Sequence, residues 1–281
     1  MVIIRTTEEL KKKIISLRSE GKSIGFVPTM GALHIGHVSL IKQAKENNDI
    51  VICSIFVNPN QFNDKNDLVN YPRMEDQDCI LLKENSCDLV FIPAVEEVYP
   101  EPDSRNFEFG ILDKILEGKF RPGHFNGVAQ VVSRLFDLVN PHRAYFGLKD
   151  YQQVMIIKKL VDFLNLDVEI IPCEIVRESD GLAFSSRNAL LTEEERKLAP
   201  VIYKLLKKAE ELISGNSIEF VKQQIVKDLQ KYPLLRLDYF EICRPETLSI
   251  INPIENKVPA IALIAVFIGK VRLIDNHLLN N

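Results

Sequence analysis

Residues 24–37 read IGFVPTMGALHIGH, and this stretch decides how the rest of the chain is interpreted. Its first four residues are apolar and end at Pro28, which predicts a short buried strand that stops there. The segment that follows, PTMGALHIGH, holds two glycines and two histidines and runs into a helical pattern. A strand, a glycine-containing turn and a helix in this order place backbone N–H groups and a helix N-terminus where phosphate can bind.

The two histidines of this turn are candidates for work on a phosphate. His34 and His37 are three residues apart, so they share one face of a helical turn. Gly31 permits a tight turn, and Gly36 lets a ligand approach the backbone with no Cβ in the way. Imidazoles placed there can donate hydrogen bonds to phosphoryl oxygens as charge builds in a transition state. A strand–turn–helix with two incidental histidines is the alternative, and a zinc site would need a third ligand.

Short β-rich runs alternate with helical patterns over residues 1–175. The predicted strands are residues 24–27, 50–57, 89–92, 143–146 and 168–171. The predicted helices are residues 39–47, 76–84 and the stretch with Val154, Ile157, Val161 and Leu164 at helical spacing. The run IVICSIFV is apolar on both faces, which is typical of a parallel strand between two helix layers. The alternation predicts an α/β fold, a Rossmann-like doubly wound parallel sheet.

After the first 175 residues the pattern changes, and residues 176–281 are expected to form a second, smaller α+β C-terminal domain. Thr192 and Glu195 form a capping box that begins a helix ending near Ile213, and a second amphipathic helix covers residues 218–230. Strands are expected at residues 237–243, 260–268 and 271–274. Gly269-Lys270 between the last two is a two-residue hairpin signal.

Composition bounds the class of protein. With 281 residues the chain has room for about two domains, and 46% hydrophobic with 26% charged residues is typical of globular proteins. The 35 basic and 39 acidic residues give a net charge of −4, which argues against a nucleic-acid partner. The longest apolar run, residues 258–268, is too short for a membrane helix, which needs about 20 residues. Five scattered cysteines without a C-x-x-C pair, and an N-terminus unlike a signal peptide, predict a cytoplasmic location.

Two polar segments directly follow predicted strands. NPNQF, residues 58–62, lies at a strand's carboxyl end, where ligands bind in open α/β sheets, so Gln61 is placed to touch a substrate. An ordinary Asn-Pro turn is the alternative. In GLKDYQQ, Lys149 suits a polyphosphate, Asp150 can accept from a ribose hydroxyl or cap the next helix, and Gln153 faces back to the strand ends. A capped helix with a surface lysine would look the same.

Two further segments complete the set. DGLAFSSRN, residues 180–188, offers two hydroxyls and the planar donors of Arg187 on a loop that begins with glycine, which suits a mobile phosphate clamp. Taken alone it is only a polar loop. GKFRPGHFN, residues 118–126, precedes a helix with Val131 and Val132 on its apolar face. It is either a substrate wall or core packing.

These segments, in this order and at this spacing, resemble the pantoate–β-alanine ligase family. The matching stretches are PTMGALHIGH, SIFVNPNQF, RPGHFNGVAQVV, YFGLKDYQQ and SSRN, and the resemblance spans essentially the whole chain. The H-x-G-H element alone marks only the wider nucleotidyltransferase superfamily, which includes class I aminoacyl-tRNA synthetases.

The resemblance implies an ATP- and Mg²⁺-dependent condensation of (R)-pantoate with β-alanine to pantothenate in two steps. The pantoate carboxylate attacks the α-phosphate of ATP, which releases pyrophosphate and leaves a bound pantoyl adenylate. The β-alanine amine then attacks the acyl carbon, and AMP leaves. The resemblance also implies a homodimer, small-molecule partners without nucleic acid or membrane, a nucleotide- and pantoate-binding domain over residues 1–175, and a lid over residues 176–281.

Site residues are carried over position by position. The implied catalytic residues are His34, His37, Lys149 and Arg187. The implied ATP site comprises Met30, Gly31, His34, His37, Gly147, Lys149, Asp150, Val176, Phe184, Ser185, Ser186 and Arg187. The implied pantoate and β-alanine contacts are Asn58, Gln61, Val131, Val132 and Gln153. Asp78 is the best single candidate for Mg²⁺, although an ion held mainly by ATP phosphates needs few protein ligands.

Three positions depart from the family pattern. Phe184 stands where relatives often carry Met, Leu148 where a polar residue is common, and Asn63 where Gly is common. The first two flank the polar contacts, so they put local packing in doubt rather than activity.

Other functions remain as alternatives. A nucleotidyltransferase could stop at a product such as a dinucleotide or a CDP-alcohol, although the paired glutamines and the C-terminal domain favour a ligase. Length and the lack of a basic surface disfavour a tRNA synthetase. An inactive nucleotide-binding module is disfavoured because His34, His37, Lys149 and Arg187 are all present.

Overall fold

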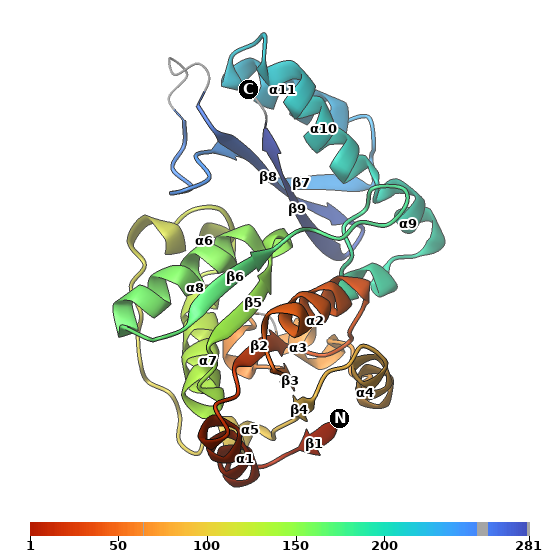
Figure 1. Cartoon of the computed structure of the whole chain (residues 1–281). Coiled ribbons are helices and arrows are strands. Elements are labelled where there is room, and N and C mark those ends of the chain that lie inside the picture. The colour runs from red at the N-terminus through yellow and green to blue at the C-terminus, as the bar shows by residue number, and fades with distance from the viewer. Residues whose placement is uncertain (64, 252–257, 280–281) are drawn as a thin grey trace. The chain divides into compact units, whose positions relative to one another are not determined.

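The computed structural model describes residues 1–63, 65–251 and 258–279 (Figure 1). The chain divides into two compact units, Met1–Leu148 with Gln152–Glu174, and Lys149–Tyr151 with Ile175–Asn281. The main division therefore falls between Glu174 and Ile175. The short segment Lys149–Tyr151 belongs to the second unit although it stands, in the sequence, within the first.

A parallel sheet forms the centre of the first unit. Within the described residues it has six strands, in the order β1 (Val2–Ile4), β4 (Leu89–Phe91), β3 (Ile50–Ile55), β2 (Ile24–Thr29), β5 (Arg143–Gly147) and β6 (Glu169–Cys173). All neighbouring strands are parallel. From β2 the chain continues to β3 and β4 on one side and later to β5 and β6 on the other, so the strand order reverses beside β2. The predicted Rossmann-like doubly wound sheet is confirmed.

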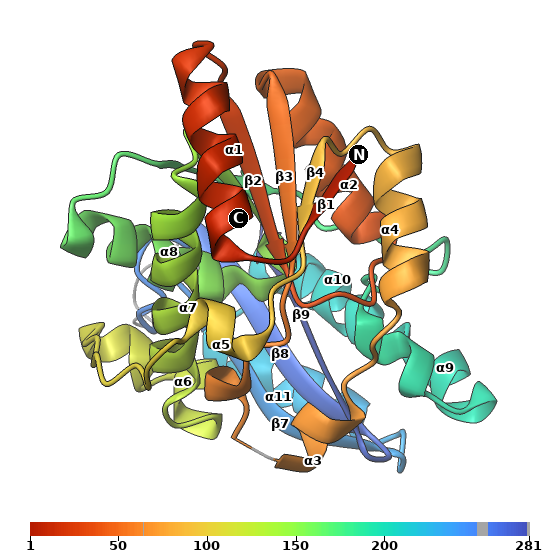
Figure 2. The same ribbon diagram turned by 90° about the horizontal axis from the view of Figure 1, so that it is seen from below.

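Helices cover both faces of this sheet. The helices α1 (Thr7–Ser19), α7 (His124–Val139) and α8 (Tyr151–Leu164) lie on one face, and α2 (Ile35–Asn47) and α4 (Glu75–Glu84) lie on the other (Figure 2). On the second face Val27, Val51 and Val90 of three strands pack with Ile41 and Ala44 of α2, and all five are at most 1% exposed. The shorter elements are η1 (Pro59–Gln61), α3 (Lys65–Asn70), α5 (Val95–Val98), η2 (Gly110–Asp113), α6 (Leu116–Phe120) and η3 (Leu148–Asp150).

The second unit is a smaller α+β structure, as predicted. Within the described residues β7 (Leu235–Cys243), β8 (Ala260–Ile268) and β9 (Val271–Leu279) form an antiparallel three-stranded sheet. Its apolar face packs against α10 (Val201–Ile213) and α11 (Ile218–Leu229). The predicted hairpin at Gly269 is confirmed, because Ile268 pairs with Val271 across it and Gly269 has a φ of +56°.

Some predictions for this unit were wrong in their bounds, and β7, expected from residue 237, begins at Leu235. The single helix expected from Thr192 to Ile213 is two helices, α9 (Glu193–Leu198) and α10, because Pro200 stands at the N-cap of α10 and lacks a backbone N–H. The capping box of Thr192 and Glu195 is present. Strand β9 continues past residue 274 to Leu279, although polar residues follow there.

Within the described part of the chain, no helix combines the length and apolar character that a membrane span requires.

Candidate active site

The turn between β2 and α2 is closed by the two histidines. His34 is the N-cap of α2: its Nδ1 accepts the Gly36 amide at 3.1 Å, and its own amide donates to His37 Nδ1 at 3.3 Å. The ring centroids lie 4.1 Å apart. The rings thus form a reciprocal capping box, a role that Ser or Thr with Glu or Gln fills in most helices. The spacing of the two histidines predicted that they share one face of a helical turn. Instead, His34 precedes α2, and the two side chains together cap its N-terminus.

This cap assigns the tautomer of both rings. Because Nδ1 of His34 and Nδ1 of His37 each accept a backbone N–H, the proton of each neutral ring is on Nε2. Both imidazoles are therefore held as Nε2–H donors at the N-terminus of α2. Donors of fixed orientation at a helix N-terminus are suited to phosphoryl oxygens.

Asp78 of α4 holds the turn that leads to the histidines. Its Oδ2 accepts the Ala32 amide at 2.9 Å and its Oδ1 accepts the Leu33 amide at 2.7 Å. Burial raises the pKa of this carboxyl, and the two amide bonds act in the opposite direction. Gly31 has a φ of +81°, and a Cβ there would lie 3.0 Å from Asp78 Oδ2, so this position requires glycine.

Asp78, the carboxylate suggested for a metal, anchors a backbone turn, and its role toward Mg²⁺ stays a prediction. Asp78 is 2% exposed, and each of its oxygens binds a backbone amide. Within the described residues, no group of three or more His, Cys, Asp or Glu side chains is arranged to hold a metal ion.

Asp78→Ala is expected to lower the free energy of unfolding by about 2–6 kcal/mol, because two amides lose their acceptor and each costs about 1–3 kcal/mol. Weaker ATP binding should accompany this loss, since the turn before His34 would no longer be anchored. Chemical denaturation and ATP titration check both effects. Asp76→Ala is the matched control, since Asp76 is exposed in the same first turn of α4. Equal destabilisation by the two substitutions would contradict the anchoring role.

A buried pair of amides follows strand β3. Asn58 Nδ2 donates to Gln61 Oε1 at 3.2 Å and to the Gly127 carbonyl at 3.0 Å, while Asn58 Oδ1 accepts the Tyr99 hydroxyl at 3.0 Å. Because Gln61 Oε1 is engaged, its Nε2 is directed to Met30, whose Sδ lies 3.0 Å away. The structure thus brings together Gln61, expected to bind pantoate, and Met30, expected to bind ATP.

Helix α7 forms the wall behind these amides. A Cβ on Gly127 would lie 2.2 Å from the Asn60 carbonyl oxygen, so only glycine permits this approach. His124 Nδ1 lies 2.8 Å from the Gln61 carbonyl, and Gln130 Oε1 accepts from Asn60 Nδ2 at 3.1 Å. Sequence reasoning did not single out Gly127 or Gln130. A glutamine on an otherwise apolar helix face was the available signal for the second.

Val131 and Val132 of the same helix are buried, with 6% and 5% exposure. Their contact with substrate stays a prediction. Asn63, one of the departures from the family pattern, donates from Nδ2 to the Pro122 carbonyl and so bonds to the segment that precedes α7.

Gln152 and Gln153, adjacent at the start of α8, differ in burial. Gln152 Nε2 donates to the carbonyls of Leu112 at 2.6 Å and Ile115 at 2.9 Å, and its Oε1 accepts the Glu117 amide at 3.0 Å. Gln152 is therefore structural. Gln153 is half-buried. Its role toward pantoate stays a prediction, as does that of Gly147, the last residue of β5.

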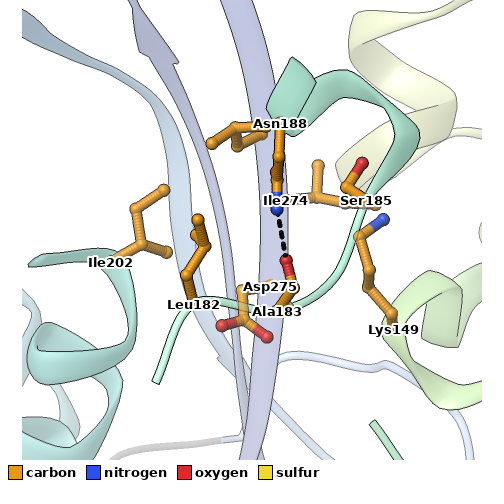
Figure 3. A pocket seen from close by; sticks show the side chains of 9 residues that line it. Lys149, Leu182, Ala183, Ser185, Asn188, Ile202, Ile274 and Asp275 are labelled. Carbon is orange, nitrogen blue, oxygen red and sulfur yellow. Dashed lines mark hydrogen bonds between the residues drawn. The ribbon is translucent and has the colours of Figure 1, made fainter. Parts of the chain in front are cut away.

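In the second unit, Lys149 and Ser185 line one pocket (Figure 3). The side chain of Lys149 extends toward Ser185 in this view. Asn188 and the buried carboxylate of Asp275 line the same pocket. Asp150 follows directly, with Oδ2 at 3.7 Å from Lys149 Nζ.

The other clamp residues belong to the loop that leads to η4 (Ser186–Leu190). The Phe184 amide donates to the Val176 carbonyl at 3.1 Å, so these two predicted ATP-site residues pair across the loop. Ser185 is the N-cap of η4, and its Oγ accepts the Arg187 amide at 3.3 Å. Ser186 and Arg187 begin this short helix.

The first unit has the architecture of a nucleotide-using enzyme of the Rossmann-like class. Its histidine turn follows the carboxyl end of β2, beside which the strand order reverses, and ligands bind at such switch points.

Within this class the chain belongs to the pantoate–β-alanine ligase family, whose model matches residues 2–278. The pantothenate synthetase of Phocaeicola vulgatus is 52% identical over 285 residues, with 98% of each chain covered. That of Caldicellulosiruptor bescii is 49% identical over 278 residues, again with 98% of each covered. The chain is therefore a ligase, and the family expected from its motifs is confirmed.

Solved structures of proteins of this family also match the chain. The pantothenate synthetase of Thermus thermophilus is 43% identical with a TM-score of 0.93, and 100% of each chain is covered. The pantoate–β-alanine ligase of Francisella tularensis, complexed with beta-gamma ATP and β-alanine, is 39% identical with a TM-score of 0.84. That match covers 99% of this chain and 97% of the other.

Proposed function

We propose that this ligase condenses pantoate with β-alanine to pantothenate, uses ATP, and passes through a pantoyl adenylate. Family membership across residues 2–278 supports the overall reaction. The Francisella tularensis ligase, whose structure holds beta-gamma ATP and β-alanine, supports these two substrates. The observation that carries the residue assignment is the reciprocal cap of His34 and His37, which presents two oriented donors at the switch point of the sheet.

In the first step, a pantoate carboxylate oxygen forms a bond to the α-phosphorus, and the bond from that phosphorus to pyrophosphate breaks. Negative charge grows on the departing oxygens. The Nε2–H groups of His34 and His37 donate to the α- and β-phosphates, and because the cap fixes their orientation they need no reorganisation at that moment. Lys149 and Arg187, which the family pattern assigns to the ATP site, supply positive charge to the phosphates.

In the second step, the β-alanine amine attacks the acyl carbon and AMP leaves with the bonding electrons. Gln61 orients pantoate through Nε2, because Asn58 holds its Oε1. Water must be kept from the adenylate, since it would hydrolyse that intermediate. That the second unit serves as the lid is a prediction.

Mg²⁺ would bind mainly to the phosphates of ATP, a mode that needs few protein ligands. When bound, it would neutralise phosphate charge. Asp78 stays the predicted protein ligand, although both of its oxygens accept amides of the turn before His34. A homodimer and a cytoplasmic location also stay predictions, and sedimentation of the purified chain checks the first.

An exchange assay without the amine tests the proposal. With ATP, Mg²⁺ and pantoate but no β-alanine, labelled pyrophosphate should enter ATP, because adenylate formation is reversible. Omitting pantoate should abolish the exchange. Pyrophosphate release with a nucleotide-capped end product would instead indicate a nucleotidyltransferase. ATP binding without any turnover would indicate an inactive module.

Gln61→Ala and Gln153→Ala are each expected to raise the KM for pantoate by about tenfold, as loss of a hydrogen bond worth about 1.4 kcal/mol predicts. Neutral amides suit the hydroxyls and carboxylate of pantoate rather than a triphosphate. The dissociation constant of ATP, measured without pantoate, should therefore stay near that of the unmodified enzyme. Gln77→Ala, at an exposed position, is the control. A large loss of ATP affinity in either variant would contradict the assignment.

A further inference from the structure

Two buried polar residues of strand β9 lie next to the pocket that Lys149 lines. Asp275 and Asn276 are both 5% exposed. Asn276 Nδ2 donates to the backbone carbonyl of Lys149 at 3.0 Å. The Tyr151 hydroxyl donates to the Pro245 carbonyl at 3.1 Å. These two bonds tie the segment Lys149–Tyr151 to the second unit.

The neighbouring residue on β9 ties down the loop that leads to Ser185. Arg177 donates to both carboxylate oxygens of Asp275, at 2.6 Å and 3.0 Å, and to the Gly181 carbonyl at 3.1 Å. It also donates to the Asn276 carbonyl at 3.2 Å, and its guanidinium lies 3.8 Å from the centre of the Tyr203 ring. The segment with Lys149 and the segment with Ser185 are thus fixed to adjacent residues of one strand.

The Arg177–Asp275 pair also bears on the charge of Lys149. Asp275 lines the same pocket as Lys149, and a buried carboxylate without a partner would attract that ammonium. Arg177 binds both of its oxygens in a bidentate pair, so the carboxylate is already neutralised. Lys149 can then direct its charge to a phosphate.

We propose that Asn276 is a positioning residue for Lys149. Its amide fixes the Lys149 carbonyl, and with it the point from which the side chain starts, on the strand that also holds the loop of Ser185. In this proposal Asn276 acts through the position of Lys149 and not by contact with substrate. The inference rests on the proposed function, in which Lys149 binds the phosphates of ATP.

A double-mutant cycle tests this role, because coupling appears when one residue acts through the other. Calorimetric titration with a β,γ-nonhydrolysable ATP analogue measures its dissociation constant. Asn276→Ala is expected to raise this constant about tenfold in the otherwise unmodified enzyme and less than about twofold in the Lys149→Ala background. Equal losses in the two backgrounds, or none in either, would overturn the proposal.

Two further variants separate positioning from stability. Asn276→Leu keeps about the shape of the side chain but removes the donor and adds no charge, so it should behave like Asn276→Ala and serves where alanine does not fold. His277→Ala removes the neighbouring contact of His277 Nε2 with Glu210, 2.8 Å long, on the same strand. The analogue should bind this control normally, and weakened binding would show that any damage to β9 has the same effect.

The single variant Lys149→Ala distinguishes the failure of this inference from that of the proposed function. If it binds the analogue normally, the assignment of Lys149 to the phosphates falls and the positioning role of Asn276 falls with it, while the pyrophosphate exchange assay still decides the proposed reaction. If it binds weakly while Asn276→Ala still adds its full effect, the assignment of Lys149 stands and only the positioning role of Asn276 is wrong.

Discussion

Lys149→Ala is expected to slow pantoate-dependent pyrophosphate exchange by a factor on the order of 10²–10³. Loss of one oriented contact to developing charge raises the barrier by about 2.7–4 kcal/mol. The side chain of Lys149 lines its pocket together with Ser185, and Arg177 already neutralises the nearby Asp275. The ammonium of Lys149 is therefore not needed to neutralise Asp275, and the substitution removes a positive charge that the phosphates would otherwise use.

The fold of this variant should be intact. The ion pair of Lys149 with Asp150 is 3.7 Å long and its carboxylate partner is 47% exposed, so its loss should cost little stability. The bond from Asn276 goes to the backbone carbonyl of Lys149 and survives the substitution. An unchanged unfolding midpoint beside a large loss of exchange is the expected pair of results.

Two comparisons sharpen this experiment. Lys149→Arg keeps the charge but changes its shape and reach, so partial activity would show that a compact ammonium is required. Lys158→Ala removes an exposed lysine of α8 and should leave exchange unchanged. Normal exchange in Lys149→Ala would remove this residue from the site.

The buried strands could be predicted because burial on both faces leaves a continuous apolar run in the sequence. Strand β1 (Val2–Ile4), with two of its three residues exposed, was not predicted. The run of residues 50–57 contains β3, although the strand ends at Ile55, where the chain begins to turn toward Asn58. Helix α2 begins four residues before the predicted helix of residues 39–47. It begins at Ile35, since His34 acts as its N-cap, and histidine with a glycine two residues on is not a usual helix-start signal.

Contacts over long sequence separations could not be predicted. Polar residues at 275 and 276 predict the end of a strand, yet β9 continues because Arg177, nearly a hundred residues earlier, pairs with Asp275 in the buried position. The contacts of Asp78 could not be predicted for the same reason. Its partners are the backbone amides of Ala32 and Leu33, which carry no sequence signature. Residue types and strand ends point to candidate positions, while the hydrogen bonds that hold them appear only in the folded chain.

His34 and His37 each have two tasks, and amide side chains can separate them. Nδ1 of each ring accepts a backbone N–H in the cap, and Nε2 is the donor toward phosphate. An asparagine oxygen occupies about the place of Nδ1, so His34→Asn and His37→Asn should keep the cap and lose the donor. A glutamine amide reaches the place of Nε2, so His34→Gln should keep a donor and lose the cap. Position 37 is the third residue of α2, where glutamine is a usual capping-box residue, so His37→Gln should keep its part of the cap.

The expected result is that stability and activity separate. The asparagine variants should unfold at nearly the temperature of the unmodified enzyme, whereas His34→Gln should lose about 0.5–2 kcal/mol with the cap. Pyrophosphate exchange should follow the opposite order. It should survive in part with glutamine and fall by a factor on the order of 10²–10³ with asparagine or alanine, as expected when an oriented donor is removed.

The loss should also fall on one half-reaction. The donors act on phosphates as pyrophosphate leaves, so variants supplied with preformed pantoyl adenylate and β-alanine should form the amide at close to the normal rate. Rapid-mixing measurements of each half-reaction check this. Equal damage to both halves, or asparagine variants as active as glutamine variants, would show that the rings do not act as Nε2–H donors. Stoichiometric zinc that is lost in any of these variants would instead make the two histidines metal ligands. The structure argues against that role, because each Nδ1 accepts a backbone amide and the proton is then on Nε2.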